Sequence, residues 1–155
     1  MADATQSGTG AGAGRGDDGS GVRCVIVTPE MTSLDTRARS VTLPLFDGQR
    51  GVARGHSPFI GRLGAGEVRI TGEQGGAADA VRRVFVEGGF VEVGHNAVTV
   101  ITQRAIPAEN IDLTQARADF EKIRGTTATG EDAIAAKMQA EATAREVVRI
   151  AERNR

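Results

Sequence analysis

The chain has 155 residues, a formal net charge of −1, 39% hydrophobic residues, and neither Trp nor Tyr. Nucleic acid binding normally requires a basic face of Lys and Arg, and the charge balance gives no sign of one. No run approaches the roughly 18 apolar residues of a membrane-spanning helix, so we expect a protein that is at most peripheral to a membrane. A small core of Val, Ile, Leu and Ala buries limited surface, so we expect partners to stabilise it.

Residues 1–21 are Gly-rich, with Ala, Ser, Thr and Asp between the glycines. So little apolar surface cannot offset the entropy lost on ordering, and we predict a disordered tail. The stretch also lacks the apolar segment of a signal peptide. Cys24 is the only cysteine and lies within an apolar run, which predicts a buried thiol in a protein of the reducing cytoplasm.

Short apolar or alternating segments fill residues 22–106 and are separated by turn signals. We interpret the glycine clusters at residues 64–66 and 87–89 as breaks between strands, although a bulge or tight bend is the alternative at residues 87–89. Residues 94–96 (GHN) are typical of a hairpin turn. This pattern predicts an antiparallel β-sandwich of about 8–10 short strands.

The chain changes character at Pro107, beyond which Ala, Glu and Arg replace the β-branched residues. Asp112 is placed to cap a first helix that ends at Gly125, and Gln115 is placed to complete a capping box. A second helix is predicted over residues 131–153. Residues 107–155 should therefore form an antiparallel helical hairpin, which makes the whole chain an α+β fold. The expected apolar stripes are Leu113, Ala116, Phe120 and Ile123 in the first helix and Ile134, Met138, Ala142 and Val148 in the second.

The most constrained stretch is residues 51–59, GVARGHSPF, in which glycines and a proline shape a corner. As a general base, His56 would need a nucleophile and an orienting carboxylate. Its neighbour Ser57 should point to the opposite face of an extended chain, so a packing or interface role is favoured over catalysis. His95 has no second histidine or cysteine near it in sequence, so we expect a solvated turn residue. We expect no catalytic residue, metal site or cofactor.

Four blocks of the sequence resemble the epsilon subunit of F-type ATP synthases. Residues 51–59 resemble that family's G-V-x-P-G-H-A-P corner, and residues 84–93 (VFVEGGFVEV) its F-V-x-G-G-F-x-E-V hairpin. Residues 28–30 (TPE) match its first turn, and residues 98–101 with 105–106 match the segment after the hairpin. The resemblance covers residues 22–124, and it covers the second helix only by position and composition.

The resemblance implies a non-catalytic central-stalk (rotor) subunit of a proton-translocating ATP synthase, peripheral on the cytoplasmic side of the bacterial plasma membrane. The sandwich would bind the gamma subunit and the c ring. The hairpin could dock on the sandwich or extend toward the alpha/beta head, where it would block ATP hydrolysis. The implied contacts with gamma and the c ring are Asp47, Gln49, Arg54, His56 and Phe59.

Two of these positions depart from the family pattern. Arg54 stands where the family usually has proline, which puts the rigidity of the corner in question. Gln49 stands where an acidic residue often contacts the c ring, and Asp47 nearby is expected to supply that charge instead.

Some family members bind ATP through an I/L-D-x-x-R-A motif at the first helix. Ile111, Asp112 and Ala116 match this motif, but Gln115 replaces its arginine. Because glutamine carries no charge for a phosphate, we predict that this remnant binds ATP weakly or not at all. Arg117 is no substitute, since it points about 200° around the helix from Gln115.

Two other classes of protein remain open. One is a stand-alone sandwich-plus-hairpin adaptor outside any synthase; a beta-subunit gene next to this one would argue against it. The other is a small hydrolase that uses His56 and Ser57. For a hydrolase, His56→Ala would abolish turnover and leave the fold intact, whereas loss of gamma binding alone would favour the rotor subunit.

Overall fold

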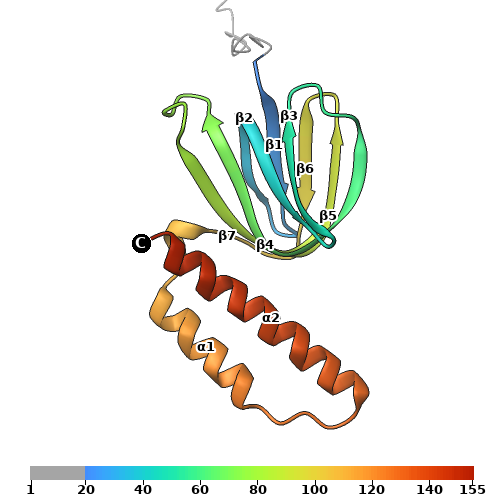
Figure 1. Cartoon of the computed structure of the whole chain (residues 1–155), viewed down its shortest axis with the longest axis vertical. Coiled ribbons are helices and arrows are strands. Elements are labelled where there is room, and N and C mark those ends of the chain that lie inside the picture. Colours follow the sequence, from blue (N-terminus) through green and yellow to red (C-terminus); the bar gives the residue numbers. More distant parts are fainter. Residues whose placement is uncertain (1–19) are drawn as a thin grey trace, which may run out of the picture.

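The computed structural model describes residues 20–155, so residues 1–19 of the expected tail lie outside the described part. Within that part, a seven-stranded β-structure precedes two helices, which confirms the predicted α+β class (Figure 1). The elements in chain order are β1 (Val22–Val27), β2 (Thr32–Leu45), β3 (Gly48–Ala53), β4 (Phe59–Glu73), β5 (Val81–Gly94), β6 (Ala97–Ile101), β7 (Ala105–Pro107), the 3-10 turn η1 (Ala108–Asn110), α1 (Leu113–Gly125) and α2 (Glu131–Arg153).

The sheet closes on itself around one aliphatic core. Its strands follow the order β1-β6-β5-β4-β2-β3, and β1 also pairs with β2, which closes the row. The strand pairings are antiparallel except for β1 with β6, which run parallel. The buried side chains inside are those that the composition allows, among them Val22, Ile26, Val41, Leu43, Val68, Ile70, Val91 and Val100.

β4 and β5 are single long strands, so the strand breaks predicted at residues 64–66 and 87–89 were wrong. The two strands pair without a change of register across both glycine clusters, with Leu63 opposite Gly89. What changes there is the side that faces the core. The buried core residues pass from Leu63 to Val68 and Ile70 along β4, and from Val84 and Val86 to Val91 and Val93 along β5.

The bend depends on glycine. Gly88 and Gly89 have φ values of 66° and 104°, which side chains disfavour. A Cβ at Gly89 would lie 1.9 Å from the carbonyl oxygen of Ile101 in β6. The bend that we gave as the alternative at residues 87–89 is therefore the correct interpretation, and it lets two strands wrap both sides of the core.

The turn between β5 and β6 is the predicted hairpin. His95 and Asn96 have φ values of 50° and 56°, the left-handed pair of a type I′ turn. The confirmed turn places His95 at the hairpin tip, where its side chain is exposed.

The helical hairpin lies against one end of the sandwich, which the last turns of α2 approach most closely (Figure 1). The predicted stripe of α1 is confirmed, since Ala116 is buried and its partners are partly buried. The stripe predicted for α2 was wrong, because Ile134 and Met138 are 47% and 67% exposed. These two residues belong to the loop end of the helix, away from the sandwich. The face that packs consists of Thr143, Val147, Ile150 and Ala151.

Candidate partner-binding surfaces

The corner that contains His56 is a tight turn at the end of β3. The N–H of His56 donates to the carbonyl oxygen of Ala53 at 3.1 Å, and Gly55 has a φ of 80°, as in the third position of a type II turn. Arg54 is in the second position, which favours proline but accepts other residues. The N–H of Gly55 also donates to Oδ1 of Asn96 at 2.8 Å, which ties the corner to the β5–β6 turn. Gly55 and Asn96 therefore fix the corner without a proline.

The side chain of His56 is used in packing. Its Nδ1 donates to the backbone carbonyl of Ser57 at 2.8 Å, and its ring lies 5.4 Å from that of Phe59, centroid to centroid. The guanidinium of Arg50 covers Phe59 at 5.1 Å, and Phe59 packs on the main core. Because His56 contacts the carbonyl of Ser57 and not its hydroxyl, the arrangement lacks the base–nucleophile contact of a hydrolase. Within residues 20–155, no acidic, histidine or cysteine cluster is placed to hold a metal ion.

The predicted partner contacts fall into two groups. Asp47 and Gln49 are exposed in the turn that opens β3, while Arg54 and His56 follow its other end. A six-residue strand spans about 20 Å, so the structure does not bring the groups together. Oε1 of Gln49 already accepts a hydrogen bond from Arg69 at 3.0 Å, which leaves the carboxylate of Asp47 as the charge exposed in this turn.

An outer apolar patch, defined here as Phe46, Ile60, Phe90 and Ile101, lies on the solvent side of the sandwich. Phe90 is directly opposite Ile101 on one side and Arg62 on the other, and the guanidinium of Arg62 covers the ring of Phe46 at 4.7 Å. The exposed fractions of the four side chains run from 55% to 79%. Exposed apolar side chains grouped around one arginine in this way are typical of an interaction site.

A groove of about 640 Å³ lies between the helices α1 and α2 and the part of the sandwich formed by Glu87, at the bend of β5, and Arg104, just before β7. Ile111, Asp112 and Ala116, the remnant of the ATP motif, all line it. Asp112 caps α1 as predicted, because its Oδ1 accepts from the N–H of Gln115 at 2.8 Å.

The groove has few groups that could bind the phosphates of a nucleoside triphosphate. The side-chain amide of Gln115 does not reach back to complete the capping box; it donates to Oδ1 of Asp119 at 2.8 Å. Arg104 pairs with Glu87 at 2.9 Å, and Arg117 points elsewhere to pair with Glu152. The charged lining comprises the acidic Glu87, Asp112 and Asp119 and the basic Arg104 and Lys122.

The hairpin is held by a second, smaller apolar cluster outside the main core. Ile150 of α2 is 1% exposed and packs with Phe85 of β5 and Ala108 of η1. Val147, Ile106, Ile111 and Ala65 surround these three residues and are only partly buried. The interface between hairpin and sandwich is thus small, and the residues at its edge are partly exposed to solvent.

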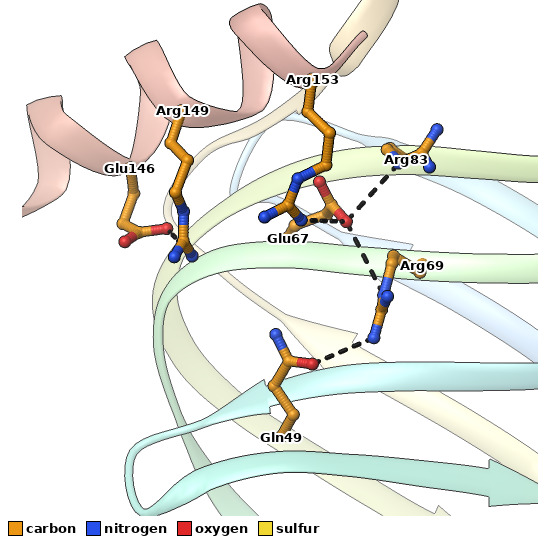
Figure 2. Close-up of polar contacts among 7 residues, drawn as sticks. All are labelled: Gln49, Glu67, Arg69, Arg83, Glu146, Arg149 and Arg153. Atoms are coloured by element: carbon orange, nitrogen blue, oxygen red, sulfur yellow. Dashed lines mark hydrogen bonds and ion pairs between the residues drawn. The ribbon is translucent and has the colours of Figure 1, made fainter.

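A buried carboxylate, Glu67, is directly opposite Phe85 of this cluster on the neighbouring strand, and Figure 2 shows its polar contacts. The side chain of Glu67 is 4% exposed, and its Oε1 is 3.7 Å from Nε of both Arg69 and Arg83. Nη1 of Arg153, from the last turn of α2, is 3.6 Å from the same oxygen. Glu67 Oε2 and Arg83 Nε are both buried without a hydrogen bond.

Cys24 is a buried core residue, as predicted. Burial, with the nearby carboxylates of Glu73 and Asp35, raises the pKa of its thiol to about 12. The thiol is therefore protonated and unreactive at neutral pH.

The architecture is that of a closed β-sandwich with a helical hairpin docked on its outside. Residues 21–108 match the family model of the ATP synthase Delta/Epsilon chain, beta-sandwich domain. An ATP synthase epsilon chain from Rhodopirellula baltica is 48% identical over 95 residues, 61% of this chain and 70% of that one. Another, from a Synechococcus species, is 32% identical over 130 residues, 82% of this chain and 90% of that one. The chain belongs to the epsilon-chain family of F-type ATP synthases.

Solved structures share the fold. A chain in the Euglena gracilis mitochondrial ATP synthase (OSCP/F1/c-ring) has a TM-score of 0.69 at 20% identity, covering 96% of this chain and 90% of that one. A chain of the Tetrahymena thermophila synthase central stalk and c ring has a TM-score of 0.61 at 16% identity, covering 84% of this chain and 96% of that one. Neither helix of the described part is long and apolar enough to cross a membrane.

Sequence reasoning missed two of these features. The contact of Glu67 with Arg153 depends on where α2 docks, which no local pattern reveals. The outer apolar patch did leave a signal, because Phe90 precedes Glu92 on the outward side of an alternating strand and breaks the polar pattern of that face.

Proposed function

We propose that this chain is a non-catalytic rotor subunit of a proton-translocating F-type ATP synthase, which couples the gamma shaft to the c ring. It would act as a peripheral protein on the cytoplasmic side of a bacterial plasma membrane. The outer apolar patch carries the proposal, because four exposed apolar side chains grouped around Arg62 are costly in a free subunit and useful in an assembled one. Family membership supports gamma as the partner that covers them.

The turn between β2 and β3 is the proposed contact with the c ring. Asp47 is exposed there, while Gln49 is bonded to Arg69, so Asp47 supplies the negative charge. A rim charge of this kind contributes mainly to specificity and to the rate of association. Arg54 and His56, at the far end of β3, are proposed to contact gamma.

The hairpin is proposed to inhibit ATP hydrolysis when it leaves the sandwich and reaches the alpha/beta head. Its docking depends on a small cluster around Ile150 and Phe85, and Ile134 and Met138 of α2 remain exposed when it is docked. A small interface lets two positions of the hairpin differ by only a few kcal/mol, which a switch requires.

The test is ATP hydrolysis by the reconstituted head of the same enzyme, with the full chain and with a chain that lacks residues 108–155. We expect hydrolysis to rise on truncation while binding to gamma is retained. Unchanged hydrolysis would remove the inhibitory role, and failure of the full chain to bind gamma would remove the rotor role.

A further inference from the structure

We propose that Glu67 and Arg153 form an electrostatic latch that holds the hairpin on the sandwich. Its regulatory use rests on the proposed inhibitory role of the hairpin, but the latch itself is a property of this chain alone. Arg153 is in the last turn of α2 and Glu67 in the middle of β4, so their ion pair joins the two parts of the molecule (Figure 2).

The sandwich contributes three charged residues to the latch, independently of the helix. Arg69 and Arg83 are directly opposite each other on β4 and β5, and like charges in that relation repel. Glu67 shares their face and contacts both guanidiniums through one oxygen, Oε1. The negative charge of Glu67 therefore offsets the repulsion between Arg69 and Arg83, which the strand register places next to each other.

In the docked state, the stability of the contact between hairpin and sandwich depends on the cations around Glu67. The side chain of Glu67 is 4% exposed, and its Oε2 has no hydrogen-bond partner in the docked arrangement. A buried carboxylate without hydrogen bonds depends on neighbouring cations, and Arg153, whose side chain is 45% exposed, supplies one of the three around Oε1 only when the hairpin is docked. When the hairpin leaves, water can solvate Glu67. Loss of Arg153 therefore penalises the docked state and leaves the undocked state unaffected.

The chain offers a matched control in the same helix. Arg149 is one turn before Arg153 and its guanidinium pairs with Glu146, also in α2, and not with the sandwich. Figure 2 shows the two arginines side by side, with only Arg153 joined to Glu67. Arg149→Gln removes the same charge from the same helix without touching the latch.

The experiment measures thiol labelling of the full chain carrying Ala108→Cys. Ala108 is 2% exposed beneath Ile150, so its cysteine reports undocking, while Cys24, 0% exposed in the main core, reports global unfolding. Arg153→Gln is expected to speed labelling at position 108 roughly 10-fold. This factor corresponds to a loss of stabilisation between those typical of exposed and of buried ion pairs. Labelling of Cys24 should stay unchanged, and Arg149→Gln should change neither rate.

Adding Glu67→Gln supplies the second test. The double variant of Glu67 and Arg153 should label at position 108 no faster than the faster single variant, because Arg153 has no carboxylate to pair with once Glu67 is neutral. If the accelerations of labelling by the two single changes multiply in the double variant, the latch is overturned. Equal acceleration of labelling at position 108 by Arg149→Gln, or parallel acceleration of labelling at Cys24, would also overturn it. So would immediate, complete labelling of position 108 in the chain that keeps Arg153. None of these measurements involves the synthase, so failure of the latch is distinguishable from failure of the rotor role.

Discussion

Replacing Phe90 by alanine tests whether the outer apolar patch binds the gamma subunit. Phe90 is 59% exposed, and that fraction of a side chain of roughly 200 Å² is about 120 Å² of apolar surface that a partner would remove from water. At about 25 cal/mol per Å² this area corresponds to about 3 kcal/mol, or a loss of roughly 100-fold in affinity. The free energy of unfolding should change by no more than about 1 kcal/mol, because most of the side chain is already in water.

The assay is calorimetric binding of the purified chain to the gamma subunit of the same organism. Ile134→Ala is the control, because Ile134 is also an exposed apolar residue, 47% exposed, but belongs to the loop end of α2. Its affinity for gamma should stay within about twofold of the unmodified chain. An unchanged Kd for Phe90→Ala, or an equal loss for both variants, would refute the assignment of the patch.

Three further predictions concern the fold and the groove. Gly89→Ala should cost more than about 3 kcal/mol in urea denaturation, because its Cβ would meet the carbonyl of Ile101, whereas Gly51→Ala, with open space around it, should cost less than about 1 kcal/mol. Between neutral pH and about pH 8.5, Cys24 should leave the unfolding free energy unchanged. Above about pH 8.5 its contribution should fall by up to about 1.4 kcal/mol per pH unit toward pH 12, because the unfolded thiol ionises before the folded one; Cys24→Ala should abolish this contribution. Calorimetry should detect weak or no ATP binding to the isolated chain, and the Gln115→Arg variant should bind ATP more tightly than the unmodified chain. Tight, saturable binding by the unmodified chain would contradict the prediction.

The sequence predicted the parts of the fold that depend on local chemistry. The left-handed turn at His95 and Asn96 and the cap at Asp112 each follow from the residues that form them. A glycine cluster is harder to interpret from the sequence, because glycine is equally suited to a turn between strands and to a bend within one strand. The clusters at residues 64–66 and 87–89 are bends within paired strands, and only the pairing of β4 with β5 distinguishes the two.

The candidate sites were less predictable because they depend on contacts between distant elements. α2 carries apolar residues on more than one face, and the position of the sandwich decides that Ile150 is buried and Met138 is not. Glu67 has the outward position of an ordinary solvated carboxylate, yet two arginines of the sandwich and one of the docked helix meet at its Oε1. Gln49 is expected to contact a partner, and no local pattern reveals that Arg69, two strands away on β4, donates a hydrogen bond to its side chain.

The central claim is that this chain is a stoichiometric part of the rotor. The most direct measurement is purification of the synthase from membranes of the same organism through a tag on its beta subunit, followed by quantitation of every subunit. We expect this chain in a one-to-one ratio with gamma, together with the c subunits. A complete, active synthase that lacks this chain would contradict it.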